Sequence, residues 1–252
     1  MSAAIDLNCD LGEGAGHDAE LMPLVTSANI ACGAHAGDEA EMRATVRLAQ
    51  QHGVSIGAHP GFADREHFGR RELDLQPEEI VRLVRTQLES LIRIAGETGA
   101  RVSHVKPHGA LYNLSFKNAR VADAIAEAVA GVEPNLWLYG MAGGELIKAG
   151  KARGLRVASE VFADRTYQAD GSLTPRGRLD ALVADAVASV EQALRIIREG
   201  RVTSTEGGDV IITADTLCLH GDGEHAVEFA RGLRVALQRE NVCVRALATV
   251  PV

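Results

Sequence analysis

The chain has 252 residues, a formal net charge of −8 and 46% apolar residues, and only 4% of its residues are aromatic. This length suits one α/β barrel with a large core. No basic run is long enough to follow a phosphate backbone, so we expect no nucleic-acid partner. No apolar run approaches the roughly 18 residues that cross a bilayer, and no secretory leader fits the first residues. We therefore expect a cytoplasmic protein without a membrane partner.

Strand and helix patterns alternate along the chain, and no linker or low-complexity stretch divides it. Up to residue 129 the patterns predict strands at 5–10, 29–33, 54–58 and 102–106, and helices at 38–52, 77–98 and 118–129. After residue 129 they predict strands at 136–139, 156–161, 217–220 and 242–247, helices at 144–152, 179–199 and 224–239, and a hairpin at 202–204 and 210–213.

Seven or eight strand–helix units predict a single α/β barrel over residues 1–252, either complete or incomplete. A doubly wound open sheet is the alternative. It would need a Gly-rich phosphate turn after the first strand, and the sequence has none there. The four cysteines lack paired zinc spacing, and we expect reduced, mostly buried thiols. They are Cys9, Cys32, Cys218 and Cys243.

Several predicted strands carry polar residues on one face. Because side chains alternate along a strand, Asp6, Asn8 and Asp10 share one face of the first strand. The same parity groups His104 with Lys106. Barrel interiors are normally apolar, and buried carboxylates or imidazoles are costly unless they are paired, solvated or bound to metal. A polar interior therefore indicates function, although for Asp6 a structural role weighs equally.

The polar motifs follow the predicted strands, where α/β barrel enzymes carry their chemistry. We expect site roles for Asp10, His35, His59, Lys106 and His108. Asp38 fits a helix N-cap as well as it fits a site role. The remaining histidines outside strands are expected on the surface. These are His17, His52, His67 and His225.

A metal site is one chemical reading of these residues. Asp10, His35 and His59 supply one carboxylate and two imidazoles, a set that suits a divalent ion in a hydrolase. His104 and His108 are four residues apart, which spans about 13 Å along a strand, whereas two ligands of one ion lie about 4 Å apart. We therefore expect these two histidines not to share a metal.

Seven stretches of the chain, read in order, resemble the family of the A subunit of 5-oxoprolinase, also called the LamB/YcsF family. They are DLNCDLGE, LMPLVTSANIACGAHAGD, IGAHPG, FGRRELDL, HVKPHGALYN, EVFADRTY and LCLHGD, and they extend from Asp6 to Asp222. The resemblance implies a barrel similar to that of carbohydrate deacetylases and glycoside-processing enzymes. It also implies ATP-driven opening of the lactam of 5-oxo-L-proline to L-glutamate, together with subunits B and C.

The residues allow a mechanism for this implied reaction. Amide hydrolysis passes through an oxyanion, which Lys106 or a bound metal would stabilise. Asp10 or a neutral histidine such as His108 would act as the base, and Glu160 would orient the cations. The candidate substrate-binding residues are Asp6, Asn8, Arg165 and His220. No GxxxxGK[ST] loop occurs, so we expect ATP to be bound by a partner or in a pocket shared with one.

Two other functions stay open from the sequence. The first is a metal-dependent deacetylase of a carbohydrate or another N-acyl compound, which the Asp/His set and the implied fold support. The second is a noncatalytic component that binds or passes on the substrate of its partners.

Overall fold

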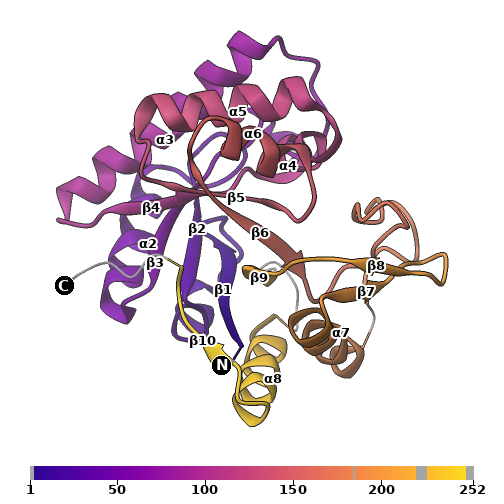
Figure 1. Cartoon of the computed structure of the whole chain (residues 1–252). Coiled ribbons are helices and arrows are strands. Elements are labelled where there is room, and N and C mark those ends of the chain that lie inside the picture. The colour runs from indigo at the N-terminus through magenta and orange to yellow at the C-terminus, as the bar shows by residue number, and fades with distance from the viewer. Residues whose placement is uncertain (1–2, 184, 220–225, 248–252) are drawn as a thin grey trace.

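Seven parallel strands close into a barrel in the computed structural model, which describes residues 3–183, 185–219 and 226–247 (Figure 1). The barrel strands are β1 (Ala4–Leu11), β2 (Ser27–Ala31), β3 (Ser55–His59), β4 (Val102–Val105), β5 (Trp137–Met141), β6 (Arg156–Phe162) and β9 (Thr216–Leu219). Closure is made by β9, which pairs with both β6 and β1. The predicted α/β barrel is therefore confirmed, and it has seven strands rather than eight.

The last predicted strand forms but does not enter the ring. It is shortened to β10 (Cys243–Val244), which pairs in parallel with Ala4 and Ile5 at the start of β1. The predicted hairpin is confirmed as β7 (Arg201–Thr203) and β8 (Asp209–Ile211), an antiparallel pair separate from the barrel.

Helices cover the outside of the barrel (Figure 1). They are α1 (Asp18–Leu21), α2 (Glu39–His52), α3 (Pro77–Glu97), α4 (Gly109–Lys117), α5 (Ala119–Val132), α6 (Glu145–Ala152), α7 (Ala186–Glu199) and α8 (Ala226–Arg239), with short 3-10 turns η1 (Met22–Leu24) and η2 (Arg65–His67). Within the described residues, none of these helices is long and apolar enough to cross a membrane.

The ends of α2 show how the sequence sets a helix. The Asp38 carboxylate accepts a hydrogen bond from the Glu41 amide at 2.9 Å, which confirms the N-cap. Gly53 then ends the helix in the left-handed conformation, with φ of 65°, which a glycine adopts without steric cost. These two residues fix where α2 begins and ends between β2 and β3.

The sequence pattern was wrong about the start of the helix expected at residues 179–199, since α7 begins only at Ala186. The preceding segment folds back on the chain that leaves β6. The Thr166 amide donates to the Ala181 carbonyl, and the Val183 amide donates to the Asp164 carbonyl. Pairing between the two segments satisfies these backbone groups, so this segment is not helical although its apolar residues follow helical spacing. We call residues 163–183 the β6 excursion.

Candidate active site

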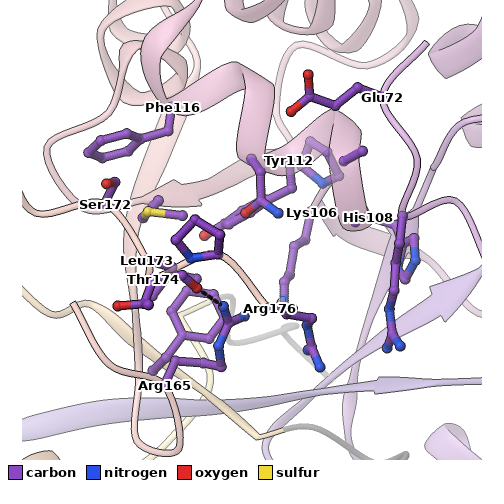
Figure 2. A pocket seen from close by; sticks show the side chains of 18 of the residues that line it. Glu72, Lys106, His108, Tyr112, Phe116, Arg165, Ser172, Leu173, Thr174 and Arg176 are labelled. Carbon is purple, nitrogen blue, oxygen red and sulfur yellow. Dashed lines mark hydrogen bonds between the residues drawn. The ribbon is translucent and has the colours of Figure 1, made fainter. Parts of the chain in front are cut away.

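A cavity of about 490 Å³ opens where the barrel strands end, within the usual size range of small-molecule sites (Figure 2). The barrel contributes polar residues to it, and α4 and the β6 excursion contribute the remaining walls. Its charged lining residues are Asp10, Glu13, His59, Arg70, Glu72, Lys106, His108, Lys117, Arg165 and Arg176.

Lys106, directly after β4, is a buried cation that lines this cavity. Its Nζ lies 2.9 Å from Asp10 Oδ1, 2.9 Å from Glu160 Oε1 and 3.0 Å from Cys218 Sγ. Burial opposes the charge on the ammonium group, but Asp10, Cys218 and Glu160 together raise the pKa of Lys106 well above its ordinary value. The side chain is therefore a fixed positive charge at the base of the cavity.

Glu160 at the end of β6 is held from its other side by α4. The Tyr112 hydroxyl donates to Glu160 Oε2 at 2.5 Å. Burial, reinforced by the Glu160 charge, raises the pKa of Tyr112 well above its usual range, so the hydroxyl keeps its proton and donates. Glu160 thus links the position of Lys106 to helix α4.

Three histidines and one glutamate meet on the other side of the cavity, and all of them except His35 line it. Glu13 Oε1 lies 3.2 Å from His35 Nε2, 3.3 Å from His108 Nδ1 and 3.8 Å from His59 Nε2. The His35 and His108 rings stack with their centroids 3.7 Å apart. We call Glu13, His35, His59 and His108 the histidine cluster.

Backbone carbonyls fix the tautomers of two of these rings. His59 Nδ1 lies 2.7 Å from the Lys106 carbonyl oxygen, and His108 Nε2 lies 2.8 Å from the Phe68 carbonyl oxygen. Since a carbonyl only accepts, both nitrogens donate. In the neutral rings, His59 Nε2 and His108 Nδ1 are then both acceptors, yet they face each other at 2.9 Å. The two lone pairs repel unless a proton or a metal cation stabilises them.

The ionisation of the cluster follows from its burial. Burial lowers the pKa of His35 to about 4 and lowers the pKa of His108 below its ordinary value. Burial also opposes charge on His59, but the Asp10 carboxylate outweighs it and raises the pKa of His59. For Glu13 burial acts upward, and the contacts of its carboxylate with His108 and His35 still hold its pKa well below the usual range. The cluster thus presents a carboxylate and two imidazoles that favour the neutral form, His35 and His108, whereas Asp10 favours the charged form of His59.

The histidine cluster fits a divalent metal ion. One potential ligand atom from each of its four members lies within 4.8 Å of all the others. Ligands with bonds of about 2.1 Å lie up to about 4 Å apart, so a small adjustment brings four donors to one ion. The carbonyl partners of His59 and His108 are the second contact that metal-binding histidines usually make. The His35 Nδ1 atom is buried and has no hydrogen-bond partner within the described chain.

The metal set expected from the sequence is only partly brought together. His35 and His59 are in the cluster, whereas Asp10 lies at its edge, with Oδ2 at 3.4 Å from His59 Nε2 and Oδ1 on Lys106. The structure adds Glu13 and His108. It also separates His104 from His108, because His104 Nε2 lies 2.9 Å from Asn29 Oδ1 inside the barrel.

Asp6 and Asn8 lie in the barrel interior and do not line the cavity. Four hydroxyl groups donate to the Asp6 carboxylate, from Thr26, Ser27, Tyr139 and Thr216. The Asn8 amide donates to Thr216 and its carbonyl accepts from Asn29 and Lys106. These contacts support the strands under Lys106. Burial raises the pKa of Asp6, although the four hydroxyls oppose the shift.

The other two expected substrate-binding residues are Arg165 and His220, and only Arg165 lies among the described residues. Arg165 lines the cavity from the β6 excursion, and its guanidinium donates to the carbonyls of Ala181 and Thr174. His220 lies outside the described residues. Among the histidines expected on the surface, His17 is half-buried, His52 is exposed, and His67 pairs with Asp64, while His225 also lies outside the described residues.

Glu13 and Tyr112 were not singled out from the sequence. Both lie inside stretches that carry the family resemblance, at the end of DLNCDLGE and within HVKPHGALYN. Cys218 was expected only as a buried thiol, and it is one, although it also contacts Lys106.

The fold and the site together define an α/β barrel enzyme with its polar site at the carboxyl ends of the strands. Residues 5–252 match the LamB/YcsF family, and the chain belongs to this family. A curated relative from Geobacillus kaustophilus (strain HTA426), which is named as the A subunit of 5-oxoprolinase, is 56% identical over 246 residues, which cover 96% of each chain.

Solved structures agree with this assignment. The lactam utilization protein from Thermus thermophilus superposes with a TM-score of 0.91 at 43% identity, over 97% of this chain and 100% of that chain. The peptidoglycan deacetylase PdaC from Bacillus subtilis has a TM-score of 0.50 at 12% identity, over 98% of this chain and 88% of that chain. The second likeness concerns the fold alone.

Proposed function

We propose that this chain is the A subunit of an ATP-dependent 5-oxoprolinase, which opens the lactam of 5-oxo-L-proline to L-glutamate. The observation that carries the proposal is that Lys106 and three members of the histidine cluster, Glu13, His59 and His108, line one cavity of a chain 56% identical to a relative with this name. The designation as a subunit supports a complex, and we take its other members to be subunits B and C.

Lys106 would stabilise the charge that develops on the lactam oxygen during hydrolysis. Its ammonium group is already oriented by Asp10 and Glu160, so little reorganisation is needed when the oxyanion forms. Asp10 lines the cavity and would accept the proton of the attacking water. Glu160 would act through Lys106 as a positioning residue, because its own oxygens face Lys106 and Tyr112.

The histidine cluster would hold a divalent cation, which would supply Lewis-acid chemistry beside Lys106 when bound. His108 would then serve as a ligand rather than as the base that the sequence suggested. The tautomers fixed by the carbonyls of Lys106 and Phe68 leave His59 Nε2 and His108 Nδ1 as donors for that cation.

ATP would enter through a partner. The chain has no GxxxxGK[ST] loop, and the cavity lies among side chains and loops rather than at a glycine-rich phosphate turn. Phosphorylation of the lactam oxygen would convert a poor electrophile into a good one and release ADP, and the ATP would be bound by, or shared with, the partner. Water would then add to the ring carbon, the C–N bond would break, and hydrolysis of the resulting acyl phosphate would give the carboxylate and phosphate. We take the complex to be cytoplasmic, because it would draw on ATP.

The test is to incubate the purified chain with 5-oxoproline and ATP, with and without subunits B and C, and to measure glutamate, ADP and phosphate. We expect turnover only with the partners and its loss in Asp10→Asn. The deacetylase function would replace the proposal if the assembled complex opened no lactam and the wild-type chain released acetate from N-acetylated sugars.

A further inference from the structure

Arg165 is a buried cation whose guanidinium contacts no carboxylate among the described residues. The residue is 4% exposed, and its guanidinium makes its hydrogen bonds to the carbonyls of Thr174 and Ala181. Within residues 3–183, 185–219 and 226–247, no carboxylate oxygen lies within 4.0 Å of it. Buried charges are normally paired, because their desolvation is costly. The guanidinium lines the cavity, so an anion in the cavity can supply the missing charge.

A second arginine lies on the same wall. Arg176 is exposed, lines the cavity, and has no ion pair with any described residue. Its charge acts on Arg165, since burial first and Arg176 second lower the pKa of Arg165 to about 10. Two like charges on one wall repel, and an anion bound between them removes this repulsion.

An unused hydroxyl completes this wall. Thr174 is fully buried and lines the cavity, and its Oγ1 atom has no hydrogen-bond partner within the described chain. Its carbonyl is one of the two that accept hydrogen bonds from the Arg165 guanidinium, at 2.6 Å (Figure 2). A buried hydroxyl without a partner costs free energy that a ligand atom can recover.

We propose that Arg165, Arg176 and Thr174 form the subsite that binds the carboxylate of the lactam substrate. Figure 2 shows Arg165 and Thr174 on one side of the cavity and His108 on the other, with Lys106 between them in this view. A carboxylate held by the arginines would direct the rest of the ring toward Lys106 and the histidine cluster. This assignment rests on the proposed function, and it makes the negative charge of the substrate a condition for binding.

The test measures binding of 5-oxo-L-proline and of 2-pyrrolidinone, the same lactam without the carboxylate, to the full chain by calorimetry or ligand-observed NMR. Arg176→Gln is the first variant, since this exposed side chain can change without disturbing the fold. We expect it to weaken 5-oxoproline binding by about tenfold to hundredfold, as for one charge-assisted hydrogen bond, and to leave 2-pyrrolidinone unchanged. Thr174→Val should weaken the same ligand selectively.

Arg178→Gln is the matched control, because Arg178 is two residues away and pairs with Asp180 outside the cavity. Unchanged 5-oxoproline affinity in Arg176→Gln, or no binding of 5-oxoproline to the wild-type chain, would overturn the subsite. Inorganic phosphate that binds more tightly than 5-oxoproline and depends on Arg176 would overturn the carboxylate assignment in favour of a phosphoryl group. The proposed function is judged separately, by turnover of the assembled complex.

Discussion

The imidazole rings of His59 and His108 meet edge to face, with their centroids 4.8 Å apart and an interplanar angle of 86°. The first ring comes from the end of β3 and the second follows β4. This arrangement points His108 Nδ1 at His59 Nε2, while the opposite nitrogen of each ring is occupied by a carbonyl. The arrangement gives a direct prediction about metal binding.

We expect the chelator-treated chain to bind one equivalent of Zn²⁺ or Co²⁺, because one carboxylate and three imidazoles suit these ions. His108→Ala should weaken the affinity by at least about tenfold to hundredfold. Calorimetry with Zn²⁺ and the visible absorption of bound Co²⁺ measure this without reference to activity.

His67→Ala is the control for metal binding, since His67 pairs with Asp64 outside the cluster. Equal affinities of the His67 and His108 variants would show that the cluster does not hold the ion. Absence of any stoichiometric binding would leave a proton as the cation that His59 and His108 share.

Lys106→Met should abolish lactam opening and destabilise the fold. The substitution keeps most of the side-chain volume but leaves Asp10 and Glu160 buried without their cation, and breaking a buried ion pair costs about 3–5 kcal/mol. Urea unfolding followed by circular dichroism measures the free energy of unfolding. Lys106→Met/Glu160→Gln should recover part of the stability and none of the activity.

Lys148→Met is the comparison for this measurement, because Lys148 forms an exposed ion pair with Glu145 at 2.6 Å in α6. Exposed pairs contribute little to stability, so this variant should behave as wild type. The buried network would have no energetic role if both lysine variants unfolded at the same urea concentration.

The sequence could predict the polar face of the barrel because alternation along a strand is a local property. Parity alone placed Asp10 and Lys106 on interior faces, and closure of the ring then brought them to 2.9 Å. Glu13 could not be placed in this way. It lies beyond the end of β1, after Gly12 with φ of 70°, and a left-handed turn removes the alternation on which the prediction depends.

In the β6 excursion, by contrast, a periodic pattern of apolar residues predicted a helix that does not form. Leu179 and Leu182 continue the helical spacing of α7, yet both are exposed and the helix begins at Ala186. Backbone pairing between Arg165 and Leu182 fixes this segment, and such long-range pairing leaves no periodic signal. Arg165 was singled out from its motif, but the position of Arg176 beside it on the cavity wall could not be predicted from the sequence.

Gly57→Ala should destabilise the protein strongly. A Cβ at residue 57 would lie well inside 3.0 Å of His104 Nε2, and the His104 ring is fully buried and stacked on Tyr139. Overpacking of this kind costs about 1–3 kcal/mol and sometimes more, and we expect the upper end or beyond. The midpoint of urea unfolding measures it.

A second glycine provides the matched control for Gly57. Gly96 lies in α3, and an added Cβ would meet nothing within 4 Å, so Gly96→Ala should stabilise the helix by about 0.5–1 kcal/mol. Gly57→Ala/His104→Ala should lose less stability than Gly57→Ala alone. If the double variant is no better, the clash with His104 is not the cause.

The stability of the fold should fall in acid, and His104 should account for part of the slope. Burial, followed by the charge of Lys106, lowers the pKa of His104 from 6.5 to about 3. The unfolded chain therefore binds a proton at this residue below pH 6.5, and the folded chain does not until about pH 3. This contribution of His104 to stability is fully present above pH 6.5 and falls by about 1.4 kcal/mol per pH unit as the pH decreases through this window.

Urea unfolding of His104→Gln at pH 7, 6 and 5 should show a free energy of unfolding that falls less steeply than that of the wild type, by about that amount, whatever its stability at pH 7. His52→Gln, at the exposed end of α2, should keep the wild-type slope. Parallel slopes for wild type and His104→Gln would mean that His104 is protonated equally in the folded and unfolded chains.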